Sequence, residues 1–506
     1  MTARSITETN RYVGLDLGTS GLKGVVLDGS GTVTARAQGS YQTSRPVFGA
    51  SEQEPADWLA ATKEVLGELA AAVTPTRWAG MGLSGMIPTL VTLDQRGAPT
   101  RPALTWEDVR AEPQARTLRE LVGPDSLYRA TGQWLDGRYL LPMFLRLAEA
   151  EPSQSTSIAT LCSAKDFLFS WLTGEMATDP STASGFGCYG LVPRAWLREV
   201  LEAASELSSL PIPALPAVAP STMCRRLSPN VAAALELPAD LEVCLGAADS
   251  VLAADGLGLQ VDGGVAYVAG TSNVILALTS RLSFDHAHRY LVTPASDGGW
   301  GLEMDLLSTG SALEWLSFLC GAGSVASLTR LAAEIKPEDA PIFLPYLGGG
   351  EQGALWDPTL HGAIVGLDLR HGRQHLARGL LNGILMESRR CMGVLEDAGL
   401  ARSTIRVTGG SASSADFRAD LADATRWQVS TPEGGEADSS ARGAAMLAAR
   451  AIDGNTLPAA PGPGGRTTWP LRAEPDEGRA ALWDAISARH DAALAALRPF
   501  FAQTKE

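Results

Sequence analysis

The segment at residues 16–21, Asp-Leu-Gly-Thr-Ser-Gly, constrains the fold more than any other part of this chain. It lies between two apolar runs, residues 12–15 and 25–27, so the sequence predicts a strand, a tight glycine turn and a returning strand. Free backbone N–H groups in such a turn hold phosphate oxygens, and Thr19 and Ser20 add two hydroxyls at the same tip. The carboxylate of Asp16 cannot bind phosphate directly and therefore indicates an intervening Mg²⁺. The alternative is an ordinary hairpin whose glycines only supply positive φ.

The same pattern returns in the second half of the chain. Residues 267–274, Tyr-Val-Ala-Gly-Thr-Ser-Asn-Val, again predict strand, turn and strand, with Gly270 and Thr271 at the tip. A chain with one phosphate-type hairpin near the start of each half is typical of two similar lobes that face one another. We therefore expect a nucleotide to bind in a cleft between the lobes.

Composition and charge narrow the class of protein. The chain has 506 residues, too many for one core, and its 45% hydrophobic and 19% charged content is typical of a soluble globular protein. It contains no run of ~18 apolar residues and no apolar signal segment, so we expect a cytoplasmic protein with no membrane partner. The formal net charge of −15 repels nucleic acid. The six cysteines lack zinc spacing, and we expect reduced thiols.

Alternating strand and helix patterns predict an α/β fold. We expect a helix at residues 58–71, a buried strand at 78–83 answered by a strand at 88–93, and a last helix at 479–497. A proline-dense connection at residues 211–220 precedes the second half. We place the boundary slightly later, which gives an N-terminal lobe at 1–242 and a C-terminal lobe at 243–506.

The stretch at residues 101–110 places Trp106, Glu107, Asp108 and Arg110 together at the end of a strand. A flat ring beside acids suits a polyhydroxylated substrate, because its C–H faces pack on the ring and its hydroxyls donate to carboxylates. A tryptophan that anchors the core beside a helix cap explains the same residues equally well.

Two strand-to-helix junctions are further candidates. Residues 243–248 predict a strand that ends at Asp249, whose small neighbours leave it uncovered. Its carboxylate would act either as a general base or only as a helix N-cap. In the second half, Gly409 and Gly410 precede Ser411 at another junction, where paired glycines allow a nucleobase or ribose to approach the backbone. A plain turn between strand and helix has the same sequence.

From Tyr12 to the last helix the chain resembles the FGGY family of carbohydrate kinases, and within it the xylulokinases. The order and spacing of several motifs together carry this resemblance. The motifs are Asp16-Leu17-Gly18-Thr19-Ser20-Gly21, Trp106-x-Asp108-x-Arg110, Lys165-Asp166-x-Leu168, Gly246-x-x-Asp249, Gly270-Thr271-Ser272, Phe343-Leu344-Pro345-Tyr346-Leu347, Gly362-x-x-x-Gly366-Leu367 with His375-Leu376-Ala377-Arg378, and Gly409-Gly410.

The resemblance implies two actin-like, ribonuclease-H-like lobes that close on ATP and a sugar. It implies that Asp16 holds Mg²⁺ with the phosphates and that Asp249 is the catalytic base. The ATP-binding residues that it implies are Thr19, Ser20, Gly270, Thr271, Gly409, Gly410 and Ser411. On the substrate side we expect Trp106, Glu107, Asp108, Met86 and Ile87.

The chain departs from the xylulokinase pattern mainly on the substrate side. Met86-Ile87-Pro88 stands where xylulokinases resemble one another with Gln-Met-His, and Glu107 stands where an amide is usual. Ser250 follows the expected base where the family often has Asn. Further departures are Gln352 for Arg, Met143 for Lys and Asn382 for an acid. The ATP side is intact, so the prediction of a kinase is firmer than the prediction of xylulose.

Three hypotheses follow. The first is an ATP-dependent kinase for a small sugar, with D-xylulose favoured and D-xylulose 5-phosphate as the product. The second is the same reaction on ribulose, erythrulose, a pentitol or glycerol. The third is an ATP-binding sensor without transfer chemistry, which would need Asp16 but not Asp249. The chain lacks the P-loop and protein-kinase motifs. We expect a small sugar or polyol and no nucleic acid as partner, and a homodimer is left open.

Overall fold

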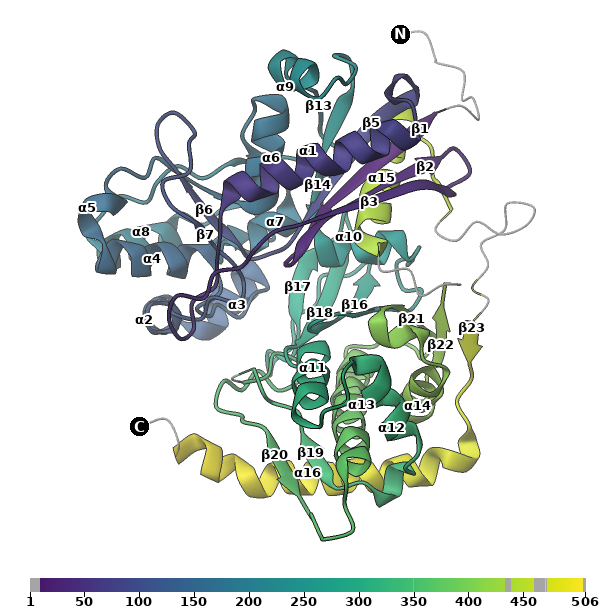
Figure 1. Cartoon of the computed structure of the whole chain (residues 1–506). Helices are drawn as coiled ribbons and strands as arrows, with labels where there is room; N and C mark the ends of the chain where they lie inside the picture. Colours follow the sequence, from purple (N-terminus) through teal and green to yellow (C-terminus); the bar gives the residue numbers. More distant parts are fainter. Residues whose placement is uncertain (1–9, 349, 433–437, 459–468, 470, 504–506) are drawn as a thin grey trace. The chain divides into compact units, whose positions relative to one another are not determined.

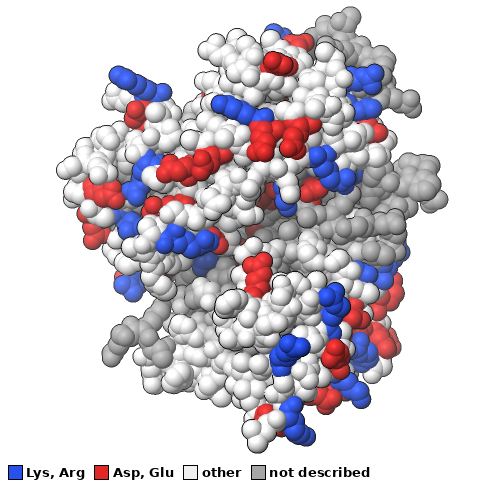
Figure 2. All heavy atoms as spheres, viewed as in Figure 1, with Lys and Arg blue, Asp and Glu red and all other residues white. Residues whose placement is uncertain are grey.

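The structure is a computed structural model that describes residues 10–348, 350–432, 438–458, 469 and 471–503 (Figure 1). The chain packs as two compact units. Unit 1 comprises the described residues of Met1–Gly258, Val292–Gly301 and Asp438–Thr467. Unit 2 comprises those of Leu259–Leu291, Leu302–Ala437 and Thr468–Glu506. Figure 2 shows acidic and basic side chains interspersed over the face that it presents.

The central sheet of unit 1 has the strand order β13-β14-β5-β1-β2-β3. Its strands are β1 (Arg11–Leu17), β2 (Gly21–Asp28), β3 (Val33–Ser40), β5 (Trp78–Gly85), β13 (Cys224–Arg226) and β14 (Glu242–Ala248). Strands β1, β5 and β14 run parallel, whereas β2, β3 and β13 pair antiparallel with their neighbours. The carboxyl ends of the three parallel strands therefore meet at one edge of the sheet.

Helices cover both faces of this sheet. Helix α1 (Pro55–Ala72) packs on β2 and β3 through buried side chains such as Trp58, Val65 and Leu69. Helix α15 (Ser439–Asp453) packs on β1 and β5, and α10 (Asp249–Gly256) packs on α15. Figure 1 shows α1 lying along β2 and β3. Apolar residues on one side of α1 explain its contact with the sheet, whereas α10 and α15 are buried on most of their sides.

A second region of unit 1 surrounds a four-stranded sheet with the order β4-β7-β6-β8. Its strands are β4 (Glu52–Gln53), β6 (Leu90–Leu93), β7 (Ala103–Leu104) and β8 (Thr160–Ser163). The remaining helices of unit 1 are α2 (Glu112–Val122), α3 (Pro124–Thr131), α4 (Leu140–Ala150), α5 (Pro152–Ser155), α6 (Ala164–Thr173), α7 (Pro180–Ser184), α8 (Arg198–Ser208) and α9 (Pro229–Ala234). Two short strand pairs complete it, β9 (Ala177–Thr178) with β12 (Ala217–Val218), and β10 (Tyr189–Gly190) with β11 (Ala195–Trp196).

Unit 2 is built on a sheet with the order β17-β18-β16-β15-β21-β22-β23, of which residues 292–294 of β17 and 300–301 of β18 belong to unit 1. Its strands are β15 (Val265–Ala269), β16 (Asn273–Thr279), β17 (Leu291–Pro294), β18 (Trp300–Leu306), β21 (Thr404–Gly409), β22 (Gln428–Thr431) and β23 (Leu471–Ala473), and β19 (Ile342–Leu344) pairs separately with β20 (Ala363–Val365). The helices are α11 (Gly310–Leu319), α12 (Val325–Ala333), α13 (Arg373–Asp397), α14 (Ala415–Thr425) and α16 (Ala480–Gln503). The buried face of α13 forms much of the core between α12 and β19.

The predicted repeat is present in the strand pairing of both sheets. In unit 1, β1 pairs antiparallel with β2 and parallel with β5. In unit 2, β15 pairs antiparallel with β16 and parallel with β21. Each hairpin has its Gly-Thr-Ser tip between the paired strands. The two expected phosphate-type hairpins are thus confirmed as hairpins on matching positions of two sheets.

Two sequence-based expectations about pairing are wrong. The strand at residues 90–93 does not pair with β5, because β5 is already flanked by β1 and β14. It pairs with β7 and β8 instead. Cys224 and Cys244, expected as thiols, form a disulfide, since β13 and β14 bring these two residues opposite one another. Their separation of 20 residues gave no signal of pairing. The other four cysteines are free.

Asp249, which we expected near the start of the C-terminal lobe, packs in unit 1. The reason is that β14, directly before it, pairs with β5 in the central sheet of that unit. The division at residue 242 stays a prediction about domains. Among the described helices, none is long and apolar enough to cross a membrane.

A buried acid in unit 2 makes the stability of the fold depend on pH. Glu351 is 3% exposed, and its Oε1 accepts hydrogen bonds from the backbone N–H groups of Leu307, Gln352 and Gly353. Burial, together with the charge of Glu387, raises the pKa of Glu351 to about 8, and the three N–H donors only partly offset this. The folded state therefore retains a proton that the unfolded chain releases above its ordinary pKa. This contribution to stability is present at acid pH and is lost as pH rises toward 8.

We predict that Glu351→Gln, which keeps an Oε1 acceptor but cannot ionise, raises stability relative to the wild type at pH 8 by on the order of a few kcal/mol. At pH 5 the two proteins should melt at nearly the same temperature. Thermal melting from pH 5 to pH 9 measures the difference, with Glu338→Gln at an exposed glutamate as the matched control. Parallel melting curves for wild type and Glu351→Gln over this range would contradict the account.

Candidate active site

Two carboxylates lie at the carboxyl-end edge of the central sheet of unit 1. Asp16, in β1, pairs in register with Ser84 of β5, and Asp249 directly follows Ala248, which pairs with Gly85 on the other side of β5. The two acids therefore flank the end of one strand, although we expected Asp249 in the other lobe. Carboxylates so placed can bind a cation and accept a proton.

Asp16 is held by its neighbour on β5. The hydroxyl of Ser84 donates to Oδ1 of Asp16 at 2.7 Å. Burial raises the pKa of Asp16, and the Ser84 hydrogen bond and the charge of Lys23 offset this only in part. A carboxylate whose charge is disfavoured in this way gains from a nearby cation, so its environment fits a Mg²⁺ ligand.

The hairpin tip beside Asp16 is braced by side chains from three other segments. Nε1 of Trp106 donates to Oγ1 of Thr19 at 2.9 Å, and Nε2 of Gln53 donates to the carbonyl of Thr19 at 2.7 Å. The phenol of Tyr41 donates to the carbonyl of Gly18. Ser20 is exposed at the tip. The predicted phosphate turn and the predicted sugar-side tryptophan are therefore in direct contact.

The two acids after Trp106 already have protein partners. Asp108 is 1% exposed; it accepts from Nε and Nη2 of Arg110 at 3.0 and 2.5 Å, and from the N–H of Ser51 at 3.1 Å. Glu107 pairs with Arg45 at 2.7 Å. These contacts fix the shape of the loop that carries Trp106, and Arg45 balances the negative charge of Glu107.

Met86 and Ile87, also expected on the substrate side, follow β5 at the same edge. The N–H of Met86 donates to the carbonyl of Leu17 at 2.9 Å, and its side chain is 1% exposed. Ile87 is partly buried, packs against the cluster around β14 and precedes Pro88 through a cis peptide bond. Ile87 therefore leaves some apolar surface accessible, whereas Met86 is part of the core.

The backbone geometry before Asp249 requires glycine at position 246. Gly246 has φ of +77°, and a Cβ on it would lie 1.6 Å from the carbonyl oxygen of Leu83. The register between β14 and β5 shifts between Cys244 and Ala247, which turns the strand toward α10. Oδ1 of Asp249 accepts from the N–H of Ser250 at 2.8 Å, and Ser440 donates to its carbonyl at 3.1 Å. Position 249 is thus fixed from α10 and α15.

A buried lysine lies behind this strand end. Nζ of Lys165 lies 3.2 Å from Oδ1 of Asp166 and 3.2 Å from Oδ1 of Asp179, and it donates to the carbonyl of Leu245 at 3.2 Å. Burial alone would lower the pKa of Lys165, but the two carboxylates outweigh it and the net shift is upward. Lys165 therefore remains charged inside the protein.

The ionic cluster continues to the residue next to Asp249. Oδ2 of Asp179 accepts from the hydroxyl of Ser181 at 2.5 Å, and that hydroxyl accepts from the N–H of Ala248 at 2.9 Å. A chain of polar contacts thus runs from Lys165 through Asp179 and Ser181 to the peptide before Asp249. The Lys165-Asp166 motif was noticed in the sequence, but nothing in it indicated this connection.

The corresponding hairpin of unit 2 is also braced. The N–H of Gly270 donates to the carbonyl of Ser272 at 3.0 Å. The carbonyl of Thr271 accepts from the N–H and the hydroxyl of Ser311, at 3.0 and 3.2 Å. The first turn of α11 therefore holds this tip in place, which the sequence did not indicate.

The paired glycines lie where β21 ends and η3 (Gly410–Ser413) begins. Gly409 has φ of +97°, and a Cβ on it would lie 2.1 Å from the carbonyl oxygen of Ala269, whereas one on Gly410 would meet nothing within 4 Å. Ser411 lines a small pocket of about 30 Å³ together with Arg378, Phe417 and other residues of α12, α13 and α14. The expected open approach to the backbone is present at Gly410.

Known proteins resemble the chain over most of its length. Residues 11–256 match the N-terminal domain of the FGGY family of carbohydrate kinases, and residues 265–452 match the C-terminal domain. A xylulose kinase from Klebsiella pneumoniae is 32% identical over 443 residues, which cover 87% of this chain and 90% of the relative. A gluconokinase from Bacillus subtilis (strain 168) is 25% identical over 459 residues, 87% of each chain.

The solved structure of a xylulose kinase from Rhodospirillum rubrum has a TM-score of 0.84 at 28% identity, and the match covers 98% of this chain and 100% of that one. The α/β fold with two actin-like lobes is confirmed. The resemblance that the sequence motifs indicated is confirmed by both family domains. The chain therefore belongs to the FGGY family of carbohydrate kinases and is an enzyme that uses ATP to phosphorylate a small sugar.

Proposed function

We propose that this enzyme transfers the γ-phosphoryl group of ATP to a hydroxyl of xylulose, with Asp249 as the general base. The observation that carries the proposal is the placement of Asp16 and Asp249 at the ends of β1 and β14, on either side of β5. The xylulose kinases among the relatives support the choice of sugar. We propose the cytoplasm as the location of the reaction.

Phosphoryl transfer depends on the alignment of the sugar hydroxyl with the γ-phosphate more than on covalent catalysis. A sugar hydroxyl is a poor nucleophile, and phosphoryl transfer proceeds when that hydroxyl is held in line with the γ-phosphate. Asp249 would accept the hydroxyl proton, and its backbone is fixed by Gly246 and by Ser440. Asp16 would hold Mg²⁺, which supplies positive charge to the phosphate oxygens when bound.

The two hairpin tips would bind phosphate through their backbone N–H groups. In unit 1 this role falls to Thr19 and Ser20, and in unit 2 to Gly270 and Thr271. A turn held rigidly from outside loses little entropy when it binds an anion, and both tips are held in this way. Adenosine would lie against residues 409–411, beside the small pocket that Ser411 lines.

On the sugar side we propose that Trp106 packs on C–H groups of the substrate. Its indole N–H is already used by Thr19, so only the ring face serves the sugar. Glu107 and Asp108 each have an arginine partner. They would accept hydrogen bonds from sugar hydroxyls only through oxygen lone pairs that these arginines do not occupy. Ile87 would supply an apolar wall, and Met86 would support that side of the site from the core behind it.

We predict that xylulose has the highest kcat/KM among candidate acceptors. A coupled assay of ADP release with xylulose, ribulose, erythrulose, pentitols, glycerol and gluconate measures this directly. Gluconate is included because gluconokinases are among the relatives. A different preferred acceptor would refute the choice of xylulose. No ADP above background with any of them would favour the ATP-binding sensor.

We predict that Asp249→Asn lowers kcat by roughly 10²-fold or more with little change in KM, because a carboxamide cannot accept the hydroxyl proton. Asn is nearly isosteric and can still accept from the N–H of Ser250, so the melting temperature should stay close to that of the wild type. Asp57→Asn, an exposed acid in the first turn of α1, is the matched control. A folded Asp249→Asn variant with near-wild-type kcat would show that Asp249 is not the general base and has only a structural role.

A further inference from the structure

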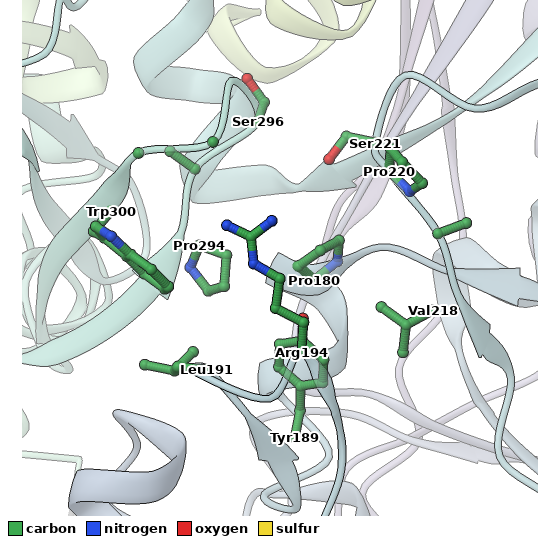
Figure 3. Close-up of a pocket in the computed structure, with 14 residues that line it drawn as sticks. Pro180, Tyr189, Leu191, Arg194, Val218, Pro220, Ser221, Pro294, Ser296 and Trp300 are labelled. Carbon is green, nitrogen blue, oxygen red and sulfur yellow. The ribbon is translucent and has the colours of Figure 1, made fainter. Parts of the chain in front are cut away.

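A separate pocket of about 250 Å³ lies in unit 1 (Figure 3). Its walls come from the loop after β10, the segment between β12 and β13, the start of α7, and the turn between β17 and β18. None of the residues assigned above to the sugar, the ATP or the metal lines it. Ligand pockets usually run roughly 300–1,000 Å³, so this one suits a small molecule.

The pocket contains one cationic side chain. Figure 3 shows the guanidinium of Arg194 extending between Pro180 and Pro294. Among the residues that the structure describes, no carboxylate oxygen lies within 4.0 Å of this guanidinium. In a protein with a formal net charge of −15, a cation left without a carboxylate is suited to bind an anion from solution.

Two hydroxyl groups of mostly buried residues also face the pocket. Ser221 is 6% exposed and Tyr189 is 1% exposed, and neither hydroxyl has a hydrogen-bond partner within the described part of the chain. Figure 3 shows Tyr189 directed toward Arg194 and Ser221 on the opposite wall. A third hydroxyl, that of Ser296, is already engaged, because it donates to Asp255 at 2.5 Å and accepts from Arg450 at 3.1 Å.

The remaining walls are apolar. They include Trp300, Leu191 and Val218, together with the prolines that flank Arg194. Apolar walls of this kind pack against the C–H faces of a polyol, while the two free hydroxyls can bond to its OH groups. The pocket thus combines one cation, two polar contacts and apolar surface.

We propose that this pocket binds a small polyol that carries one anionic group, either a phosphate ester or a carboxylate. The anion pairs with Arg194, and the polyol contacts Ser221 and Tyr189. The carbonyl of Ser221 accepts from the N–H of Gly246 at 3.0 Å, and Pro180 follows Asp179, so two walls join the segments that position Asp249. A ligand bound in the pocket would contact these segments and could therefore change kcat.

Isothermal titration calorimetry tests the proposal, with the ATP site saturated by a non-hydrolysable analogue. The probes are ribose 5-phosphate, gluconate, inorganic phosphate and neutral ribose. We expect wild type to bind at least one of the two polyol anions more tightly than ribose or inorganic phosphate, and the tighter of the two identifies the anionic group. Arg194→Gln should weaken that binding by about 10-fold or more, because a charge-assisted hydrogen bond is lost.

Arg198→Gln removes the same charge from an arginine that is 89% exposed, only four residues away, and should leave binding unchanged. Without added anion, kcat and KM of Arg194→Gln should equal those of the wild type. If Arg194→Gln fails to fold, Tyr189→Phe tests the proposal instead. We expect this variant to bind the polyol anion a few-fold more weakly than the wild type. No anion binding to wild type, equal binding of neutral ribose, or unchanged binding in the folded variants would overturn the proposal.

Discussion

The buried charge of Lys165 is the interaction on which the arrangement of unit 1 depends. Three charged groups, Lys165, Asp166 and Asp179, are fully buried together, and such groups are tolerated inside a protein only when each is paired. The pairing needs α6, the start of α7 and β14 in one place, since the lysine also donates to a carbonyl of β14. Separating these charges would cost free energy. The ionic contacts therefore hold the end of β14, and Asp249 directly after it, against the rest of unit 1.

The same strand pairing is repeated in the two units. In unit 1, β1 pairs antiparallel with β2 and parallel with β5, which comes later in the chain. In unit 2, β15 pairs in the same way with β16 and β21. This pairing leaves a Gly-Thr-Ser tip at the sheet edge of each unit, and the proposed phosphate binding would use backbone N–H groups there rather than basic side chains. Unit 1 adds Asp16 and Asp249 to this common plan, whereas unit 2 adds the open backbone at Gly410.

The sequence predicted what local patterns determine and missed what depends on distant partners. The two hairpins, the junction at Asp249 and the helix at residues 58–71 follow from glycine turns and apolar spacing, and all are present. Ser84, Gln53 and Tyr41 were missed, because a hydrogen bond to a hairpin tip leaves no periodic signal. The disulfide of β13 and β14, and the pairing of β6 outside the central sheet, were missed because strand order is a property of the whole unit.

The buried lysine cluster is placed to position Asp249 through the hydroxyl of Ser181, and the variant Ser181→Ala tests this role. Kinetics at saturating sugar and ATP, with melting curves beside them, compare this variant with Ser181→Thr, which keeps a hydroxyl, and with Ser228→Ala, which removes a serine cap on α9. We predict that Ser181→Ala loses roughly 10-fold in kcat with nearly unchanged KM, since displacing the proposed base would affect the transition state. Ser181→Thr should recover most of the rate, and Ser228→Ala should melt slightly lower at full activity. Wild-type kcat in Ser181→Ala would contradict the account.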